Sequence, residues 1–435
     1  MIRPYAALLF FLAILPAVSV GHGVVPTRES SPRVIEFPDT ADRRTLVVDL
    51  HTHSIFSDGH VWPTIRVAEA ERDGLDAMAV TEHLEYQPHI VGIPHPDRNR
   101  SFEEARRAAA GLDLAIIPGV EITRQGEAGH INAVFVEDAN ALVEQRLEHV
   151  RQEEHMFDTR EKAEAYAKEM SGMFSGAHQV EHEGRTVWMP FADEATYLAL
   201  ANFAHATTRA ARDVLEAANA QGAFLFWNHP DFESVEADLN PFHAAAVRDG
   251  LLHGIEIANG DRYYQNAHRL ALEHDLALIG VSDVHELIDW DYRPEAGEDQ
   301  GHRPVTLIFA TDTSLEAMKQ ALDERRTVVY WKDLLIGRSR DLLPLLEASI
   351  DIVEATVEPS GLRVRLANSS DAPMSLRNET GLHMGSHGQH IALPAQGETE
   401  VTFSMDESAL QALEFTVLNA LVAPNEPARI RLEQP

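Results

Sequence analysis

Short apolar runs of strand length recur along the first three quarters of the chain, and segments with helical spacing lie between them. The apolar runs cover residues 46–48, 77–81, 114–117, 223–227 and 276–281. The helical segments cover residues 63–72, 101–111, 209–221, 265–274 and 314–325. Strands that alternate with helices in this way are typical of a parallel α/β architecture, which we expect over residues 46–340.

A different pattern begins after about residue 340. Apolar and polar residues alternate over 351–358 and 362–367, a Pro-Ser-Gly turn separates the two segments, and further short runs follow at 399–403 and 413–418. Short strands with regular turns predict a small β-sandwich over residues 345–435. His383, His387 and His390 fall in a Gly-rich stretch there and are expected to be solvated.

One interval, residues 139–222, interrupts the alternation of strands and helices. Much of it is charged and helical in pattern, so we expect a helical insertion over the face on which the strands end. Long loops at such a face often act as lids, and a purely structural cover is the alternative. Its histidines, which include His149, His155, His178 and His182, are expected to be solvated.

The first residues are typical of a cleavable signal peptide, which we place at 1–21. Arg3 precedes an apolar run over 6–15, Pro16 ends the run, and small residues follow. A retained N-terminal anchor is the alternative. Residues 22–45 are predicted to be a linker, and no later segment is long and apolar enough to span a membrane. We therefore expect a secreted or periplasmic protein, whose lack of cysteine excludes disulfide bonds.

The chain has 435 residues and a formal net charge of −33. Such a surface repels long nucleic acids, because their binding depends on phosphate neutralisation by Lys and Arg. An anionic small molecule would also be repelled, unless bound cations and a few Arg side chains invert the potential locally.

Side chains that can ligate metal ions close most of the apolar runs. Residues at i and i+2 of a strand point to the same face, so His51 and His53 can hold one ion together, as can Asp283 and His285. In a parallel barrel all such strand ends open on one face. One His-x-His pair alone would more often be a hydrogen-bonded pair, but five elements with ligands predict a centre for several ions. Imidazole and carboxylate together suit Mn, Zn or Fe.

As an ensemble, these motifs resemble the PHP superfamily, which is named for polymerase and histidinol phosphatase domains. The matching pieces follow the family's order: His51-Thr52-His53-Ser54, Ser57-Asp58-Gly59, Thr81-Glu82-His83, Gly119-Val120-Glu121, His130, Asn228-His229-Pro230 and Ser282-Asp283-Val284-His285. The resemblance implies a distorted (β/α)7 barrel with two or three divalent metal ions. The whole layout is similar to the secreted branch that includes PHP-type phosphodiesterases.

The resemblance also implies the ligands of each ion. The first ion would be held by His51, His53, Glu121 and Asp283, and the second by Glu121, His130 and His229. The third would be held by Asp58, His83 and His285. Many relatives have His where Asp58 stands, so a third ion here would bind more weakly or be a harder cation. Glu82 stands where relatives have Asp, and we expect it to orient His83.

Two ions about 3.5–4 Å apart can generate a bridging hydroxide and hold the phosphoryl oxygens in line. No Ser or Cys nucleophile is then needed. A third ion, or His285 or His83 in its absence, would stabilise or protonate the leaving oxygen. The candidate catalytic residues are Glu121, Asp283, His285 and His83. Arg124 and Arg262 follow predicted strand ends and are candidates for binding the substrate phosphate, with surface ion pairs as the alternative.

The sequence therefore predicts a metal-dependent hydrolase of small phosphate esters, either monoesters or diesters. An exonuclease-like hydrolase of short oligonucleotides is the second hypothesis. A non-catalytic protein that stores or delivers Mn or Zn is the third.

Overall fold

The computed structural model divides the chain into two units, Met1–Pro32 and Arg33–Pro435. It describes residues 34–89, 92–124, 126–143, 155–171, 176–191, 193, 196–197, 209–230, 239–292, 302–384, 388–404 and 412–433. The predicted signal peptide 1–21 and residues 22–33 of the predicted linker therefore lie outside the described residues. Among those described, no helix has the length and apolar character needed to cross a membrane.

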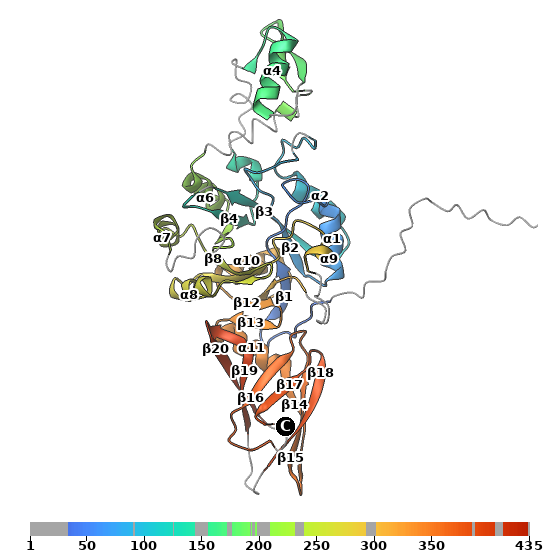
Figure 1. Ribbon diagram of the computed structural model, residues 1–435, viewed down its shortest axis with the longest axis vertical. Coiled ribbons are helices and arrows are strands. Elements are labelled where there is room, and N and C mark those ends of the chain that lie inside the picture. The colour runs from blue at the N-terminus through green and yellow to red at the C-terminus, as the bar shows by residue number, and fades with distance from the viewer. Residues whose placement is uncertain are drawn as a thin grey trace, which may run out of the picture. The chain divides into compact units, whose positions relative to one another are not determined.

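Seven strands of one large sheet follow each other in chain order (Figure 1). They are β1 (Arg44–Asp49), β2 (Ala77–Val80), β3 (Ala115–Thr123), β4 (His130–Val134), β7 (Phe224–Trp227), β8 (Gly254–Asn259) and β10 (Ala277–Val281). Strand β4 is antiparallel to both neighbours, and the other neighbouring pairs are parallel. The expectation of an all-parallel sheet is thus wrong at β4. The turn after β3 is too short for a crossover helix, so the chain must return antiparallel.

The helices that the sequence predicted between or after these strands are confirmed, with ends that shift by a few residues. They are α1 (Pro63–Arg72), α2 (Arg100–Ala108), α6 (Ala211–Ala220), α8 (Gln265–Glu273) and α10 (Leu315–Asp323). Two short helices, α7 (Pro241–Arg248) and α9 (Ile288–Asp291), were not predicted. Helix α10 begins after Ser314, whose side chain accepts a hydrogen bond from the Ala317 amide.

The two outer strands of this series, β1 and β10, meet beyond their carboxyl ends. Thr52 and Val284 form a parallel bridge, the His53 amide donates to the Val284 carbonyl at 3.1 Å, and the Asp283 amide donates to the His51 carbonyl at 2.9 Å. This contact brings the first and last predicted ligand motifs together. Because no helix separates β3 from β4, a regular alternation of strand and helix is absent there. The distorted (β/α)7 barrel stays a prediction, and the observed architecture is an α/β fold with a mixed central sheet.

The sheet continues past β1 into the C-terminal part of the chain. The strands β11 (Val305–Ala310), β12 (Thr327–Trp331) and β13 (Leu334–Gly337) are antiparallel neighbours, and a short β9 (Arg262–Tyr263) pairs with β8. Strand β13 then pairs in parallel with β19 (Ala412–Ala423). Helix α11 (Ser339–Ser349) connects the two regions along the chain.

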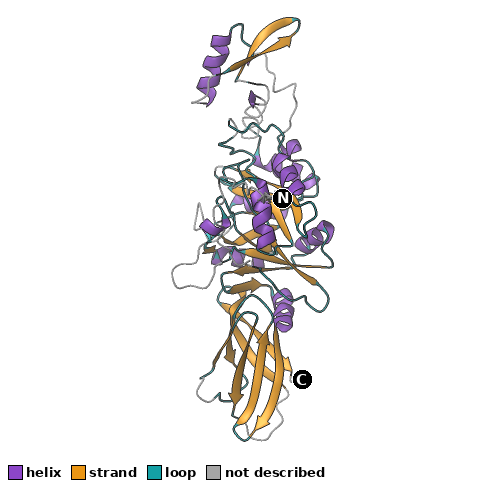
Figure 2. Ribbon diagram, turned by 90° about the vertical axis from the view of Figure 1, so that its right-hand side faces the viewer, coloured by secondary structure: helices purple, strands orange, loops and turns teal. Residues whose placement is uncertain are grey.

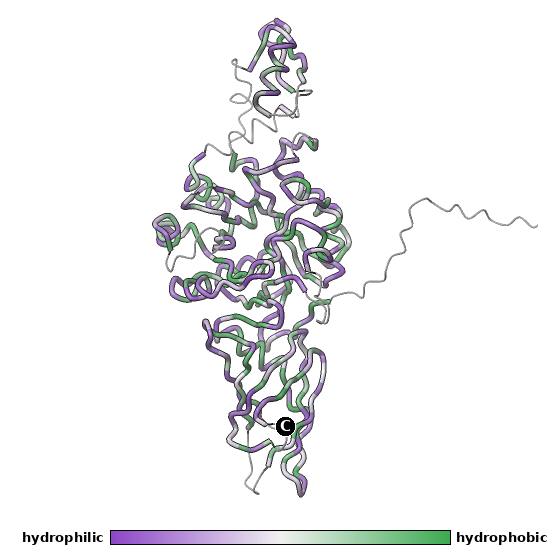
Figure 3. The backbone as a smooth tube through the Cα atoms, viewed as in Figure 1, coloured by the Kyte–Doolittle hydropathy of each residue, from purple (hydrophilic) through white to green (hydrophobic). Residues whose placement is uncertain are grey.

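Residues 350–433 form a separate three-stranded sheet and the last strands of the large sheet, which together we call the C-terminal sandwich (Figure 2). One sheet contains β14 (Ile350–Glu358), β15 (Gly361–Asn368) and β18 (Gly397–Phe403). The other contains β16 (Met374–Asn378), β17 (His390–Leu393), β19 and β20 (Glu426–Glu433). Burial alternates along β20. Figure 3 shows hydrophobic and hydrophilic stretches mixed along the backbone. His390 begins β17 and is exposed, whereas His387 lies outside the described residues.

The largest apolar core does not stop at the boundary predicted near residue 345. A single cluster of buried side chains includes Val328 and Leu335 of the main sheet, Leu346 of α11, and Val364 and Phe415 of the C-terminal sandwich. All five are at most 1% exposed. The sandwich is therefore packed on the first region through a shared core.

The described parts of the interval 139–222 are only partly helical. They contain η1 (Ala139–Leu142), α4 (Arg160–Ser171) and a hairpin of β5 (Ala177–His182) and β6 (Arg185–Pro190), besides α6. The prediction of a helical insertion is wrong for the hairpin, whose turn has positive φ at Glu183 and Gly184. His155 and His178 are partly buried and contact the Tyr197 hydroxyl and the Phe191 carbonyl, so they are not simply solvated. His149 lies outside the described residues.

Candidate metal centre

All nine side chains that the sequence predicted as ligands gather where the strands of the main sheet end. His51, His53 and Asp58 follow β1, His83 follows β2, Glu121 lies in β3, His229 follows β7, and Asp283 and His285 follow β10. His130 differs, because it is the first residue of β4. The reversed direction of β4 places its amino end beside the carboxyl ends of its neighbours, so His130 reaches the same centre.

Three overlapping groups of these side chains have ligand atoms within 4.8 Å of one another. They are His51, His53 and Asp283; His53, Asp58, His83 and His285; and His83, Glu121 and His130. The first group contains three of the four ligands that the family resemblance implied for the first ion, without Glu121, and the second contains the three implied for the third ion together with His53. His83 also approaches the second set, whereas His229 is less closely placed, with its Nε2 3.6 Å from Glu121 Oε1.

The first group is the most tightly packed. His51 Nε2 and His53 Nε2 lie 2.9 Å apart, and each lies 3.2 Å from Asp283 Oδ1. Glu121 Oε2 lies 3.5 Å from His51 Nε2 and 3.3 Å from His53 Nε2. Both imidazoles and the Glu121 carboxylate are at most 1% exposed. Nitrogen and carboxylate oxygen atoms thus converge on one point.

Unpartnered oxygen atoms indicate what this centre is built to hold. Glu121 Oε2 and Asp58 Oδ1 are buried and accept no well-aligned hydrogen bond, although His83 Nδ1 lies 2.7 Å from the former and His285 Nε2 lies 3.1 Å from the latter. An unsatisfied buried carboxylate oxygen is costly unless a cation or a donor compensates it. The imidazole and carboxylate donor set fits divalent ions such as Mn, Zn or Fe. The residues present therefore fit the metal ions that the sequence led us to expect.

The electrostatics of the cluster also favour cations. Burial would lower the pKa of His83, but the Glu121 and Asp58 carboxylates outweigh burial and raise it to about 10. Burial would raise the pKa of Glu121, yet the His83 and His51 imidazoles hold it well below its usual value. The carboxylate therefore stays ionised, and without metal the imidazoles take up protons. Divalent ions would displace those protons.

Two of the proposed ligands have backbone conformations that non-glycine residues rarely adopt. Asp283 has φ of 52° and His229 has φ of 27°. Strained φ values of this kind cost of order 1–3 kcal/mol each and cluster at functional sites. Gly59 lies in the loop after β1, where a Cβ atom would be only 2.8 Å from the Ser54 amide nitrogen. Only glycine allows the turn that carries Asp58 to pack so closely against the β1 extension.

A buried carboxylate that the sequence analysis missed supports the ligands from behind. Glu256 in β8 is 0% exposed. It lies 2.8 Å from His51 Nδ1 and accepts from the His229 amide at 2.7 Å. Such a contact fixes the ring orientation and the tautomer of a ligating histidine. The signal was present in the sequence, since a lone acidic residue interrupts the apolar strand over 254–259.

Glu82 does not contact His83 as predicted. It accepts hydrogen bonds from both hydroxyls of the turn after β1, those of Ser54 and Ser57. The Ser57 hydroxyl in turn lies 3.1 Å from His53 Nδ1. His83 is instead held by the Thr123 hydroxyl, 2.6 Å from its Nδ1. The reason is the alternation of side chains along the chain, which places neighbouring residues 82 and 83 on opposite faces.

Two buried arginines, which the sequence analysis also missed, tie the ligand segments to the fold. Arg66 of α1 donates to the His53 carbonyl at 2.8 Å and to Glu69 at 2.8 Å. Arg303 donates to Asp49 at 3.1 Å and pairs with Asp73. Both are at most 2% exposed. No local pattern identifies them, because their partners come from distant segments.

The two arginines proposed for phosphate binding lie in different environments. Arg262 is largely exposed and lines a pocket of about 380 Å³ together with seven of the proposed ligands. The other members of its lining are Asn259, Gly260, Asp261 and Tyr264. Arg124 does not line this pocket and instead pairs with Glu85, its Nη2 3.0 Å from Oε1. Arg262 thus lies beside the proposed ligands and Arg124 lies outside this pocket, and phosphate binding by either side chain stays a prediction.

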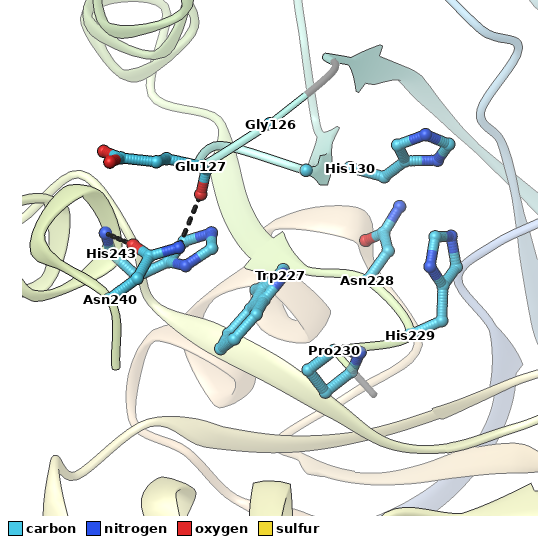
Figure 4. Close-up of a pocket in the computed structure, with 10 residues that line it drawn as sticks. Gly126, Glu127, His130, Trp227, Asn228, His229, Pro230, Asn240 and His243 are labelled. Atoms are coloured by element: carbon cyan, nitrogen blue, oxygen red, sulfur yellow. Dashed lines mark hydrogen bonds between the residues drawn. The ribbon is translucent and has the colours of Figure 1, made fainter. Parts of the chain in front are cut away.

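A smaller pocket of about 60 Å³ adjoins the centre (Figure 4). His130 and His229 lie together on one side of it, and Asn240 and His243 lie on the other. The Asn240 side chain donates to the Glu127 carbonyl at 2.6 Å, and the His243 ring stacks on Trp227 with ring centres 3.8 Å apart. This pocket has the volume of a few water molecules, too little for an ester substrate.

Comparison with known proteins agrees with this geometry. Residues 49–220 match the model of the PHP domain, and residues 350–433 match the model of an Ig-like domain. A solved structure from Bacteroides vulgatus, described as a two-domain protein containing predicted PHP-like metal-dependent phosphoesterase, is 32% identical. The alignment covers 93% of this chain and 99% of that chain, with a TM-score of 0.72. The likeness therefore includes both regions.

Two further solved structures are only distantly similar. A putative metal-dependent phosphoesterase from Bifidobacterium adolescentis is 20% identical over 59% of this chain and 92% of its own, with a TM-score of 0.35. A lesion-specific endonuclease from Pyrococcus furiosus is 14% identical over 69% of this chain and 60% of its own, also with a TM-score of 0.35. Neither carries an argument about function. No curated protein matches the chain.

Proposed function

Because the chain belongs to the PHP superfamily, we propose that it is a metal-dependent hydrolase of small phosphate esters. One observation carries the proposal: nine side chains with the chemistry of metal ligands, from six strand ends, meet in one cluster with Glu121 at its centre. Glu121 Oε2 faces His51 and His53, while Oε1 lies 2.9 Å from His130 Nδ1. A carboxylate so placed can hold two ions at a fixed separation.

When bound, such ions supply an activated water and neutralise charge on the phosphoryl group. The side chains around them position the ester. Arg262, at the rim of the 380 Å³ pocket, offers a guanidinium to the phosphate oxygens that point away from the centre. His285 has 34% of its side chain exposed and lines the same pocket, so it is placed to give a proton to the leaving oxygen.

The same features favour small substrates over polymers. Asp261 stands beside Arg262 at the rim with 89% of its side chain exposed, and the chain carries a net charge of −33. A polyanion meets repulsion beyond the ions, whereas a small monoester or diester is neutralised at the centre. The 380 Å³ volume also corresponds to a small molecule. Hydrolysis of short oligonucleotides is the second candidate, and metal storage without catalysis is the third.

Elemental analysis followed by an ester panel tests the proposal. The purified chain should contain two or three transition-metal ions. It should hydrolyse p-nitrophenyl phosphate or bis-p-nitrophenyl phosphate with kcat/KM at least about tenfold above that for a short oligonucleotide, or about 1.4 kcal/mol. Equal or better turnover of the oligonucleotide would favour the nuclease. Retained metal without turnover of any ester would favour storage, and a fully active protein with at most one ion would remove the proposed mechanism.

We further propose that the protein acts outside the cytoplasm, as the secreted branch of the resemblance implies. The support is the sequence of residues 1–21 alone. Expression of the full chain in a bacterial host, cell fractionation and mass analysis of the N-terminus test it. The mature chain should appear in the periplasm or medium, shortened near residue 21. An uncleaved cytoplasmic chain would contradict this location.

A further inference from the structure

Two asparagine side chains each donate a hydrogen bond to a carboxylate ligand of the proposed metal centre. Asn228 directly follows β7 and is 1% exposed, and Asn259 is the last residue of β8 and is 9% exposed. A neutral amide can hold a carboxylate in place without cancelling the negative charge that attracts the ions. The two residues are therefore alike on the nitrogen side of the amide, and the difference between them lies on the oxygen side.

The Asn228 side chain has partners for both of its polar atoms. Its Nδ2 donates to Glu121 Oε1 at 2.9 Å, and its Oδ1 accepts from the Asn132 backbone amide at 3.1 Å. The Asn228 backbone amide also donates to the His130 carbonyl at 3.0 Å. The oxygen of this side chain thus already has a donor within the fold.

The Asn259 side chain is held through its nitrogen alone. Its Nδ2 donates to Glu256 Oε2 at 2.8 Å and to Asp283 Oδ2 at 3.1 Å, so both of its N–H groups have an acceptor. Turning the amide over would set its oxygen, which is an acceptor, against two carboxylates that are also acceptors. The surroundings therefore fix the orientation of the amide, and its oxygen is directed away from Glu256 and Asp283.

The Asn259 oxygen is the hydrogen-bonding atom of this side chain that stays unused. Within the described residues, Oδ1 accepts no hydrogen bond, and unlike Glu121 Oε2 it keeps access to solvent. Asn259 lines the pocket of about 380 Å³ together with Arg262 and seven of the proposed ligands. An acceptor of fixed orientation at the wall of a pocket of this size is suited to recognise a donor on the bound molecule.

We propose that Asn259 is a specificity-determining residue, whose Oδ1 accepts a hydrogen bond from a hydroxyl group on the alcohol part of the substrate. The substrates are then phosphate esters of polyhydroxylated alcohols, such as esters of glycerol or of a sugar. An ester without this hydroxyl would leave the amide oxygen facing an apolar group, which disfavours its binding. The inference rests on the proposed phosphoesterase function, but the binding preference can be measured without turnover.

A pair of matched esters tests the proposal. Glycerol phosphate and propyl phosphate differ only in their hydroxyl groups, and their methyl diesters serve if the protein hydrolyses diesters alone. On the metal-loaded full chain, kcat/KM for the glycerol ester should be at least about tenfold higher, or about 1.4 kcal/mol. Asn259→Leu removes the oxygen at similar side-chain volume and should abolish this preference. Asn259→Ala should do the same, and it decides the question if Asn259→Leu fails to fold.

Asn228→Leu and Asn228→Ala are the matched controls. They remove the same kind of donor from the other carboxylate ligand, so they should lower kcat/KM for both esters alike and keep the preference. The ratio of the two values on one preparation is independent of the fraction of chains that hold metal, so lost ligand geometry alone does not change it. A parent without the preference, Asn259 variants that keep it, or Asn228 variants that lose it equally would each overturn the proposal.

Calorimetric titration separates this proposal from that of ester hydrolysis. The phosphonate analogues of both esters cannot be hydrolysed, and the metal-loaded chain should bind the glycerol analogue more tightly than the propyl analogue. Asn259→Leu should lose this difference. If no ester is turned over but the difference in binding is present, the hydrolase is excluded and the recognition site stands. If both esters are hydrolysed and bound equally well, the hydrolase stands and the proposed role of Asn259 is wrong.

Discussion

The metal centre and the core that joins α11 to the C-terminal sandwich both contain deeply buried side chains, but they are built from opposite kinds of side chain. At the centre, His51 and Glu121 are at most 1% exposed. At the junction, Leu342, Leu345 and Leu346 are 0% exposed. Burial of the ionisable groups opposes folding unless cations compensate them, whereas burial of each leucine contributes about 1.5–3 kcal/mol.

The polar centre is therefore expected to carry the activity, and the apolar core is expected to carry most of the stability. The main sheet runs continuously from β10, at the centre, through β13 to β19 of the sandwich. The shared apolar core can therefore hold the strand ends in place, while carboxylate oxygens at the metal centre stay available to bind ions. Substitutions at the centre should abolish activity while the chain stays folded. Substitutions at the junction should lower the free energy of unfolding while the folded protein stays active.

The largest effect is expected at Glu121. Glu121→Gln removes the charge that faces both groups of imidazoles, so kcat/KM should fall by about a thousandfold or more, or about 4 kcal/mol. The chain should stay folded, because no apolar contact is removed. Ester kinetics, metal content and circular dichroism check this. Glu127→Gln, an exposed neighbour on the β3–β4 turn, is the control, and a variant as active as the parent would show that Glu121 does not link the ions.

A stability effect of about 2–5 kcal/mol is expected at the junction. Leu346→Ala leaves a cavity in the shared core and should lower the free energy of unfolding by that amount. Urea unfolding followed by circular dichroism should show one transition, with kcat unchanged in the folded protein. Leu315→Ala, at an exposed position, should cost far less.

Two separate transitions in that experiment would instead support a C-terminal sandwich that folds by itself. The change of pattern near residue 340 predicts that a fragment of residues 345–435 folds alone and binds no metal tightly. The shared core and the β13–β19 pairing now make the intact chain the better unit for the comparison.

A smaller effect is expected behind the ligands. Glu256→Gln weakens the contact that orients His51, so metal affinity should fall about ten- to hundredfold. Competition with a chelator measures the affinity, and Glu273→Gln on α8 is an exposed control. An unchanged affinity would show that the contact of Glu256 with His51 does not support metal binding, and that Glu256 acts only by accepting the hydrogen bond of the His229 amide.

The smallest expected effect contrasts a buried imidazole near the junction with those at the centre. His268 of α8 is 0% exposed and contacts the Tyr263 hydroxyl. Burial lowers the pKa of His268 to about 4, whereas the carboxylates raise that of His83. Since the unfolded chain binds this proton more readily, stability due to neutral His268 is complete above pH 6.5 and is lost as pH falls towards 4.

His268→Gln should therefore reduce the slope of unfolding free energy against pH in this window by about 1 kcal/mol per pH unit. Urea unfolding at several pH values measures the slope. His274→Gln, at the exposed end of the same helix, should leave it unchanged. An identical slope in His268→Gln and the parent would show that His268 is protonated in the folded protein.

Much of the fold and most of the centre could be predicted because their signals are local. The i and i+2 spacing of His51 and His53 on a strand end, or of Asp283 and His285, is visible in a few residues. The same is true of the helix boundaries of α1 and α8, which differ from the prediction by at most one residue. The model that matches the PHP domain ends at residue 220, whereas the family resemblance also rests on the later motifs around His229 and Asp283.

The sequence by itself determined which residues have the chemistry of ligands, because residue type and strand periodicity are local properties. Only the tertiary structure decided how they combine. It reversed β4 so that His130 reaches the centre, directed Glu82 to Ser57, and placed Glu256 behind His51. It also left Arg98 buried without a partner and joined the two apolar cores. These outcomes depend on contacts between residues far apart in the chain, and such contacts leave no periodic trace in the sequence.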